Sequence, residues 1–581
     1  YSAGTIAGTL TRRYHGLLIA PLDPPLGRYL VFAKADATLI DGEREIPLHA
    51  NRWASGAIEP RGFESIESFH LDGRMPVWRY AIGDSAVEMR VWMEPGANTT
   101  YVAYRLDSPS LRTTPLRLRV NLLVNARDHH GATASGTLAP RVESHGTRLA
   151  VVHPNWFAFH IQTRGGTLTP RHEWIELFDL PAERERGLDD RDNHLCVGEA
   201  LLDLRPGEWV GLVGSLHADA SPYVEEAMRR FRASEADLLM RARALTPELV
   251  DAPDWIHRLV LAADTFVFAR PLPEMPEGES VIAGYPWFGD WGRDTMIALA
   301  GLTLPTGRYG SARKILGTFA RFVDGGMLPN FFPAAGHQAE YNSADAALWF
   351  IEAWRAYVAV TRDTASLREA FPVLAEVVRR YREGTRFGIR LDERDGLLHA
   401  GEPGVQLTWM DAKVGDWVVT PRRGKAVEIN ALWYNALCLL QTWIQEEEGR
   451  DAASFLVPWI AQVRHSFNER FWLAEGDYLY DVVDGEQGDD PACRPNQVFA
   501  VSLPHPVLAE EKWPAVVGTV RADPMVLRGI STRAHGRVLD VAVRPGESVA
   551  KGQVLAHVDP APQRNEVEQA RAKRDQARSR V

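Results

Sequence analysis

The sequence has few cysteines. Its 581 residues include three, Cys196, Cys438 and Cys493, which lie far apart in the chain and form no Cys-x-x-Cys pair. A disulfide framework and a thiolate metal site are therefore excluded as the basis of the fold. Low cysteine use is typical of a reducing compartment, so we expect a cytoplasmic protein.

The sequence also lacks an excess of basic residues and a long apolar run. Its 65 Lys and Arg residues are outnumbered by 76 Asp and Glu residues, and the net charge of −11 argues against nucleic acid as a partner. No apolar stretch reaches the roughly 18 residues that cross a bilayer, which argues against a membrane partner. Because the first residue is Tyr1 rather than Met, we expect the natural start to lie upstream.

Several signature motifs are missing. The sequence contains no GxGxxG or GKS/GKT phosphate loop, no HExxH and no GxSxG elbow, so nucleotide-binding, zinc-protease and serine-hydrolase functions lack their usual residues. His129 and His130 have no third ligand at a recognisable spacing, and a polar turn is the favoured interpretation. We therefore predict neither a metal nor a cofactor.

The hydrophobic pattern of residues 1–245 has a period of two, as in Val102, Tyr104 and Leu106. Such alternation between turn clusters predicts a β-sandwich domain over residues 1–245. Its last part, residues 222–245, has helical periodicity and is interpreted as a linker helix into the next domain.

From residue 255 onward, helical segments alternate with loops rich in Gly, Pro, Trp and Asp. This pattern predicts an α/α toroid of the (α/α)6 barrel type as a catalytic domain over residues 250–523. The helices are fewer than six pairs, so we expect a truncated barrel. The predicted helices are 255–270, 293–302, 309–323, 343–361, 364–382, 427–447, 451–472, 497–501 and 514–520.

The pattern of apolar and polar residues changes again over residues 525–581. Residues 536–559 read as two short alternating strands around a Pro545-Gly546 turn, which predicts a small β-module. A polar helix is expected after Pro562.

The most concentrated polar and aromatic segment is Tyr285-Pro-Trp-Phe-Gly-Asp-Trp-Gly-Arg-Asp-Thr295. It suits a sugar, because pyranose faces stack on indoles while carboxylate and guanidinium groups bind the hydroxyls. The alternative is a structural ion pair between Arg293 and Asp294 that is flanked by core tryptophans.

A second candidate set is Asn342, Asp345 and Trp349, which are spaced to share one face of a helix and to line a pocket. The alternative, with equal weight, is that Asp345 caps or pairs internally while Trp349 packs in the core.

The third segment is the loop 408–417, in which Asp411 lies close to Trp409 and Lys413. A carboxyl beside an indole can remain protonated near neutral pH and act as a general acid, although an ordinary solvated Asp is an equal alternative. Glu428 and Trp433 follow, and Glu428 is equally a first-turn residue stabilised by the helix dipole. Nine of the 18 tryptophans fall between residues 255 and 443, which favours a stacking site.

These segments, taken in order, resemble the bacterial and archaeal glycogen-debranching enzymes, the amylo-α-1,6-glucosidase family, over residues 1–523. The N-terminal part of the resemblance rests on residues 2–18, Gly62-Phe-Glu-Ser-Ile-Glu-Ser-Phe69 and Pro76-Val-Trp-Arg-Tyr80. The catalytic part rests on Trp291-Gly-Arg-Asp-Thr295, Thr306-Gly-Arg-Tyr309, Gly326-Met-Leu-Pro-Asn330, Tyr341-Asn-Ser-Ala-Asp345, Thr408-Trp-Met-Asp411, Ala426-Val-Glu-Ile-Asn430 and Arg494-Pro-Asn-Gln497.

The resemblance implies a β-sandwich followed by an (α/α)6 barrel that hydrolyses α-1,6-linked glucose at the branch points of glycogen or a limit-dextrin-like glucan, with inversion. It implies that Asp411 is the general acid. The base of the family follows the Arg494-Pro-Asn-Gln497 region, and this sequence leaves the pattern near residues 521–525, so Glu428 and Asp294 are candidates on proximity alone. The implied substrate-binding residues are Trp287, Trp291, Arg293, Asp294, Asn342, Asp345, Trp349, Trp409, Lys413, Glu428 and Trp433.

Residues 536–559 and the helix after them resemble the start of periplasmic adaptor (membrane-fusion) proteins, which carry a biotinyl/lipoyl-like half-motif. Lys551 lacks the context of an attachment lysine, so no biotin or lipoate is implied. We interpret the junction near residue 525 as accidental.

Three alternatives remain open from the sequence. The chain is a glucan-binding protein without catalysis, an inactive chimeric fragment, or a related exo-acting α-glucosidase. Linkage choice depends on pocket shape, which residue spacing does not reveal.

Overall fold

The computed structural model describes residues 3–23, 27–108, 116–332, 339–415 and 417–522, and two strands at 538–541 and 556–558. The chain divides into two compact units. The first unit comprises Tyr1–Phe322, Pro329–Tyr341 and Ala356–Arg368, and the second comprises Val323–Leu328, Asn342–Arg355 and Glu369–Val581. This division does not coincide with the predicted boundary at residues 245–250, which stays a prediction.

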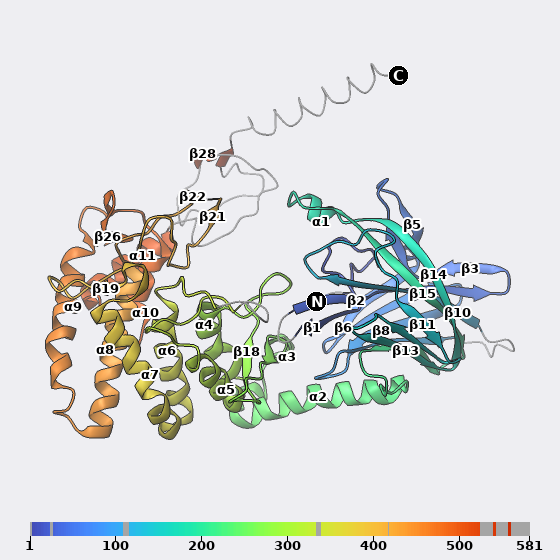
Figure 1. Ribbon diagram of the computed structural model, residues 1–581, viewed down its shortest axis with the longest axis horizontal. Helices are drawn as coiled ribbons and strands as arrows, with labels where there is room; N and C mark the ends of the chain where they lie inside the picture. Colours follow the sequence, from blue (N-terminus) through green and yellow to red (C-terminus); the bar gives the residue numbers. More distant parts are fainter. Residues whose placement is uncertain are drawn as a thin grey trace, which may run out of the picture. The chain divides into compact units, whose positions relative to one another are not determined.

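The first unit contains two antiparallel sheets, coloured blue to teal in Figure 1. The six-stranded sheet consists of β1 (Leu18–Asp23), β2 (Gly27–Asp41), β3 (Arg44–Pro47), β10 (Leu116–Asp128), β14 (Gly166–Asp179) and β15 (Arg191–Leu204), in the order β1-β2-β10-β15-β14 with β3 on β2. The eight-stranded sheet consists of β6 (Ile66–Asp72), β7 (Met75–Ile82), β8 (Ser85–Met93), β9 (Thr99–Asp107), β11 (Arg141–Ser144), β12 (Arg148–Val152), β13 (Ala158–Arg164) and β16 (Trp209–Ser215), in the order β11-β12-β13-β16-β9-β8-β7-β6. A short hairpin of β4 (Ala50–Arg52) and β5 (Ile58–Arg61) stands apart.

The core of this unit lies between the two sheets. Leu118, Val120 and Leu122 of β10 alternate with less buried residues and are themselves fully buried. They belong to one apolar cluster with Val102 and Tyr104 of β9. Side chains that alternate along a strand point to opposite faces, so the period of two places one apolar row inside. The prediction of a sheet-rich N-terminal region is confirmed.

Helix α2 (Val224–Leu245) packs on the eight-stranded sheet rather than only linking domains. Val224, Met228 and Phe231 lie at helical spacing and join a cluster that includes Trp92 and Tyr101. The apolar face of the helix thus covers sheet residues that the main core does not cover.

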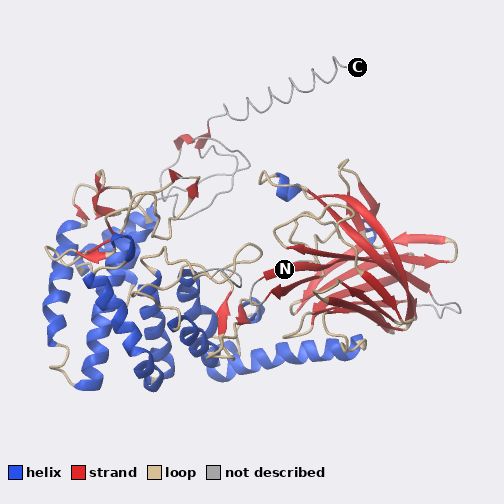
Figure 2. Cartoon of the chain, in the orientation of Figure 1, coloured by secondary structure: helices blue, strands red, loops and turns tan. Residues whose placement is uncertain are grey.

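Helical segments follow the sheets, as predicted, and Figure 2 shows them in blue. The first unit also holds β17 (Val267–Ala269) and β18 (Glu279–Val281), which form a hairpin. The main helices are α3 (Asp254–Asp264), α4 (Gly292–Thr303), α5 (Tyr309–Ala320), α6 (Ala346–Thr361), α7 (Thr364–Glu383), α8 (Val427–Glu448), α9 (Val457–Arg470), α10 (Phe499–Ser502) and α11 (Trp513–Ala522).

Helix α8 lies in the interior of the second unit. Every residue from Val427 to Leu440 is buried, as expected for a helix that is apolar on all sides. Its polar residues are paired: Asn430 accepts a hydrogen bond from the Leu398 N–H (2.7 Å) and donates to the Leu398 carbonyl (3.1 Å). Because buried amides are costly without partners, these bonds allow polar residues in a core helix.

Strands β28 (Val538–Val541) and β29 (Ala556–Val558) pair antiparallel within the segment predicted as a β-module. The Pro545-Gly546 turn and the helix expected after Pro562 lie outside the described residues. The truncated barrel stays a prediction. In the part of the chain that the structure describes, no helix has the length and apolar character needed to span a membrane.

Candidate functional site

The predicted sugar-binding loop 285–295 belongs to the first unit and leads into α4. The Gly292 N–H donates to the Asn330 carbonyl (3.0 Å), and the rings of Trp291 and Phe331 lie 5.2 Å apart. Arg293 is buried, whereas Asp294 is exposed. The loop is therefore fastened at its helical end, and the two charged residues that follow Gly292 face different environments.

Trp287, in the same loop, is 36% exposed and is contacted by residues from the β-rich region. The guanidinium groups of Arg12 and Arg186 lie 5.5 and 5.0 Å from its ring centroid, and Tyr14 meets it edge-on at 6.4 Å. Such cation–π contacts hold an indole in place. Sequence reasoning did not identify Arg12, Tyr14 and Arg186 as site residues. Arg12 and Tyr14 lie in residues 2–18, which served there only as a family motif, and no sequence signal pointed to Arg186.

Asp290, within this loop, is fully buried. Its carboxylate lies 2.8 Å from an Arg270 guanidinium nitrogen and accepts a hydrogen bond from the Ser280 hydroxyl (3.1 Å). Burial raises the pKa of Asp290 to about 6, and the opposing effects of Arg270 and Ser280 do not cancel it. Asp290 belongs to the segment that the sequence analysis singled out, but its pairing with Arg270 was not predicted.

The second predicted set does not share a helix face, which corrects the sequence interpretation. Helix α6 begins at Ala346, because the Ser343 hydroxyl accepts the Ala346 N–H (3.2 Å) at the start of the helix. Asn342 therefore precedes the helix. Asp345 is 1% exposed and accepts the Ser343 hydroxyl (2.7 Å), so it has the internal role given as the alternative. Trp349 is half-buried and packs edge-on against Phe499.

The loop that carries Asp411 lies in the second unit, before a small hairpin of β21 (Lys413–Val414) and β22 (Trp417–Val418). Asp411 is half-buried. Trp409 is 47% exposed, and its indole N–H donates to Oδ1 of Asn496 (2.8 Å). Lys413 is exposed and donates to the Gly404 carbonyl (3.4 Å). An exposed indole and a partly buried carboxyl thus lie two residues apart on a fastened loop.

Glu428 is not retained as a substrate-binding residue or as a base. Both of its carboxylate oxygens accept hydrogen bonds from Arg422, one of them at 2.6 Å, and its side chain is 2% exposed. Arg422 also bonds Asp481 at 2.6 Å. Burial lowers the pKa of Arg422, but the two carboxylates raise it more, so the guanidinium stays charged. This set is a buried ionic clamp at the start of α8.

Trp433 is also removed from the predicted site. It is 1% exposed, and its indole N–H donates to the Gly396 carbonyl (3.3 Å). It belongs to the core of α8, where no sugar can stack on it in this structure.

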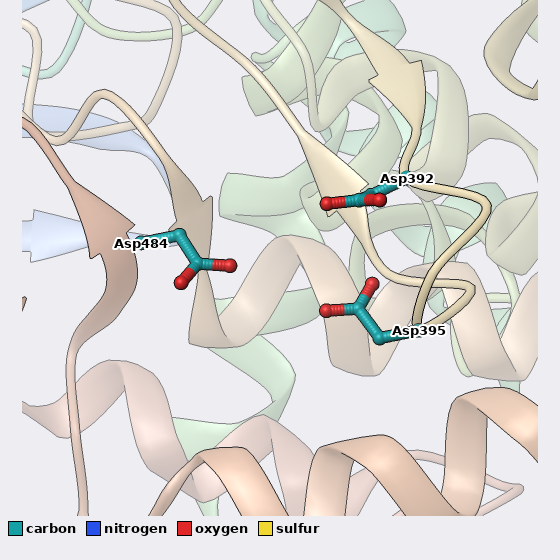
Figure 3. A group of neighbouring side chains, drawn as sticks. All are labelled: Asp392, Asp395 and Asp484. Carbon is teal, nitrogen blue, oxygen red and sulfur yellow. The ribbon is translucent and has the colours of Figure 1, made fainter.

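Asp392, Asp395 and Asp484 direct their carboxylates toward one another in the second unit (Figure 3). Their oxygens lie 2.9, 2.6 and 2.7 Å from Nζ of Lys425, which is 1% exposed. The ammonium thus stands where a cation would bind. Burial lowers the pKa of Lys425, but hydrogen bonds to the three carboxylates raise it more. Arg394 and Lys425 hold the pKa of Asp392 below its usual range.

Replacement of Lys425 by Met should destabilise the second unit by about 2 kcal/mol near neutral pH, because the carboxylates lose their shared cation. They are partly exposed, which limits the cost. Since the folded pKa of Asp392 lies below 3.8, its stabilising effect is present above that pH and is lost as the pH falls. Urea unfolding should therefore show the wild-type advantage shrinking below about pH 4.

The control is Lys314→Met in the first unit. This substitution breaks a single ion pair, with Glu279 (3.0 Å), which is more exposed than the Lys425 cluster. Its effect should stay below about 1 kcal/mol. An equal effect of the two substitutions would contradict the role of Lys425.

The described part of the chain holds a sheet-rich region followed by helices, and exposed tryptophans such as Trp287 and Trp409 lie close in the sequence to Asp290 and Asp411. Two family profiles match the chain: "Glycogen debranching enzyme N terminal" over residues 1–211 and "Amylo-alpha-1,6-glucosidase" over residues 261–535. Over both regions the chain is therefore similar to the glycogen debranching enzyme family. The resemblance of residues 525–581 to adaptor proteins stays a prediction.

A relative and a solved structure add to this comparison. The Saccharomyces cerevisiae protein described as glycogen debranching enzyme is 26% identical over 336 residues, which are 43% of this chain and 22% of the yeast protein. The chain thus spans about a fifth of that relative's length. A bacterial glucoamylase complexed with acarbose is 11% identical, with 84% of this chain and 71% of that chain covered. Its TM-score of 0.45 is too low to establish a shared fold.

Proposed function

We propose that the chain hydrolyses α-1,6-linked glucose in glycogen or a limit-dextrin-like α-glucan, with Asp411 as the general acid and inversion at the anomeric carbon. The observation that carries the proposal is the loop 408–411, where an open indole stands beside a half-buried carboxyl in a region that matches the amylo-α-1,6-glucosidase profile. The yeast relative's description supports the same reaction. Low cysteine use supports a cytoplasmic location.

In this mechanism the Asp411 carboxyl donates its proton to the glycosidic oxygen as the bond to the anomeric carbon breaks. Water attacks from the opposite face, and a second carboxylate roughly 6.5–9.5 Å from the acid accepts a proton from it. We assign no base among the described residues of the second unit, because Glu428 is fully engaged by Arg422. Asp294 remains a sequence-based candidate.

Substrate contacts are proposed for each unit by itself, with the residues numbered 287–294 in the first unit and those numbered 342–413 in the second. The indoles would stack on glucose rings, and the charged or amide groups would bind hydroxyls. The set retained is Trp287, Trp291, Arg293, Asp294, Asn342, Trp349, Trp409 and Lys413.

The test is incubation of the full chain with a limit dextrin that carries single α-1,6-linked glucose residues. We expect release of free glucose, which proton NMR should first detect as the β-anomer because the linkage inverts. Maltose and trehalose, the controls for an exo-glucosidase of another linkage, should be cut much more slowly. Binding of the dextrin without glucose release would contradict the hydrolase and favour a glucan-binding protein.

A further inference from the structure

The Arg494-Pro-Asn-Gln497 motif makes a contact that its sequence position does not suggest. It forms the start of η5 (Pro495–Val498), a short 3-10 helix in the second unit. Asn496, within it, lies 87 positions from Trp409, yet its Oδ1 accepts the Trp409 indole N–H at 2.8 Å. Its Nδ2 also approaches the sulfur of Met410 at 3.8 Å. One side chain therefore contacts both residues that precede Asp411.

The amide of Asn496 can adopt one orientation only. Its Nδ2 donates to Oδ1 of Asp481 at 2.7 Å, while its Oδ1 accepts from the indole. An indole N–H only donates, and an ionised carboxylate only accepts, so a flipped amide would lose both bonds. Asp in this position would place two acceptors against each other, and Leu would make neither bond. The chemistry at this position requires a short side chain with a donor and an acceptor.

Asp481, to which the Asn496 amide is bonded, is held rigidly. Asp481 is 1% exposed and is bonded by Arg422 and Arg494 as well as by Asn496. Arg494 also bonds Asp490 at 2.7 Å. Charge-assisted bonds among buried groups hold side chains in one geometry. The indole edge of Trp409 is thus attached to a fixed ionic cluster.

Trp409 combines this fixed edge with an open surface, since 47% of the residue is exposed. An exposed side chain that is already ordered loses less entropy when a ligand stacks on it. We infer that Asn496 is a positioning residue that orients the Trp409 indole as a stacking surface for the glucan beside Asp411. This inference rests on the proposed function and adds a residue that sets its geometry.

The experiment is a double-mutant cycle on the full chain. Trp409→Phe keeps an aromatic ring but removes the N–H, and Asn496→Leu removes the acceptor. With Asp411→Asn present in every protein to suppress hydrolysis, calorimetry would measure the Kd for a maltooligosaccharide that carries one α-1,6-linked glucose. Each single variant should weaken binding about tenfold, and the double variant no more than either one, because both remove the same bond.

The matched control is Asn435→Leu. Asn435 is 1% exposed, against 2% for Asn496; it donates to the Glu352 carboxylate (2.9 Å) and accepts the His505 N–H (3.2 Å). It should lower the melting temperature as Asn496→Leu does, yet leave the Kd unchanged. If Asn496→Leu does not fold, Trp409→Phe alone must still show the tenfold loss.

Two results would overturn the inference, and they are distinguishable. If the wild type binds the branched oligosaccharide but the two substitutions act additively, or if Asn435→Leu weakens binding equally, Asn496 is structural and the proposed function stands. If the wild type does not bind the oligosaccharide, the proposed function fails together with the inference.

Discussion

Asp411→Asn should reduce the rate of glucose release from a limit dextrin by about 10²- to 10⁴-fold, the usual contribution of a general acid. The amide has nearly the size of the carboxyl but has no acidic proton to give to the leaving oxygen. Substrate binding should change little, because the loop bonds of Trp409 and Lys413 do not involve this carboxyl. Initial rates at saturating dextrin would measure the effect.

A substrate with a good leaving group tests the role of Asp411 directly. Fluoride departs from α-glucosyl fluoride with little acid assistance, so the variant should lose far less activity on this substrate than on the dextrin. The control is Asp477→Asn, since Asp477 is exposed and has a φ of 55°, a conformation that Asn also adopts. Undiminished dextrin hydrolysis by Asp411→Asn would end the general-acid assignment.

Arg422→Met should be the most damaging substitution for stability in the second unit. It leaves the carboxylates of Glu428 and Asp481 without their shared cation, and both side chains are at most 2% exposed. Removal of one partner from a buried ionic cluster costs about 3–5 kcal/mol, because the remaining charge stays buried. That is a large fraction of the roughly 5–15 kcal/mol by which domains are stable. Urea unfolding followed by circular dichroism would measure it.

The comparison variant is Arg379→Met, which removes exposed pairs with Glu376 and Glu383 on α7. Its cost should stay below about 1 kcal/mol. The double variant Arg422→Met/Glu428→Gln should recover part of the lost free energy of unfolding, since it neutralises one of the stranded carboxylates. A cost for Arg422→Met no larger than that of Arg379→Met would show that the cluster contributes little to stability.

The helices were predictable to within a few residues where periodicity and end signals agreed. Residues 427–447 were predicted as one helix, and α8 runs from Val427 to Glu448. Other helix ends differ from the prediction: α3 ends six residues earlier, α9 starts six residues later, and α6 starts three residues later. At the start of α6, the Ser343 hydroxyl accepts the Ala346 N–H, and the composition of the segment did not predict this bond.

The site was less predictable, because residue type does not decide burial. Trp409 and Trp433 were both predicted to bind the substrate, yet one is 47% and the other 1% exposed. Glu428, like Asp411, was a candidate for the catalytic pair, but both of its carboxylate oxygens accept hydrogen bonds from Arg422. Such pairings depend on segments that only the folded chain brings together.

The sequence by itself determined the order of a sheet-rich region and a helical region, because side-chain periodicity is a local property of each element. It also marked the segments that carry aromatic and carboxyl groups. Only the tertiary structure decided which of those groups are open and which are paired. The bond from Trp409 to Asn496 joins residues 87 positions apart, and the Arg422 that clamps Glu428 also bonds Asp481, 59 positions away. These contacts form only when the elements pack together. Burial by packing then sets the free-energy cost of every polar group that is left without a partner.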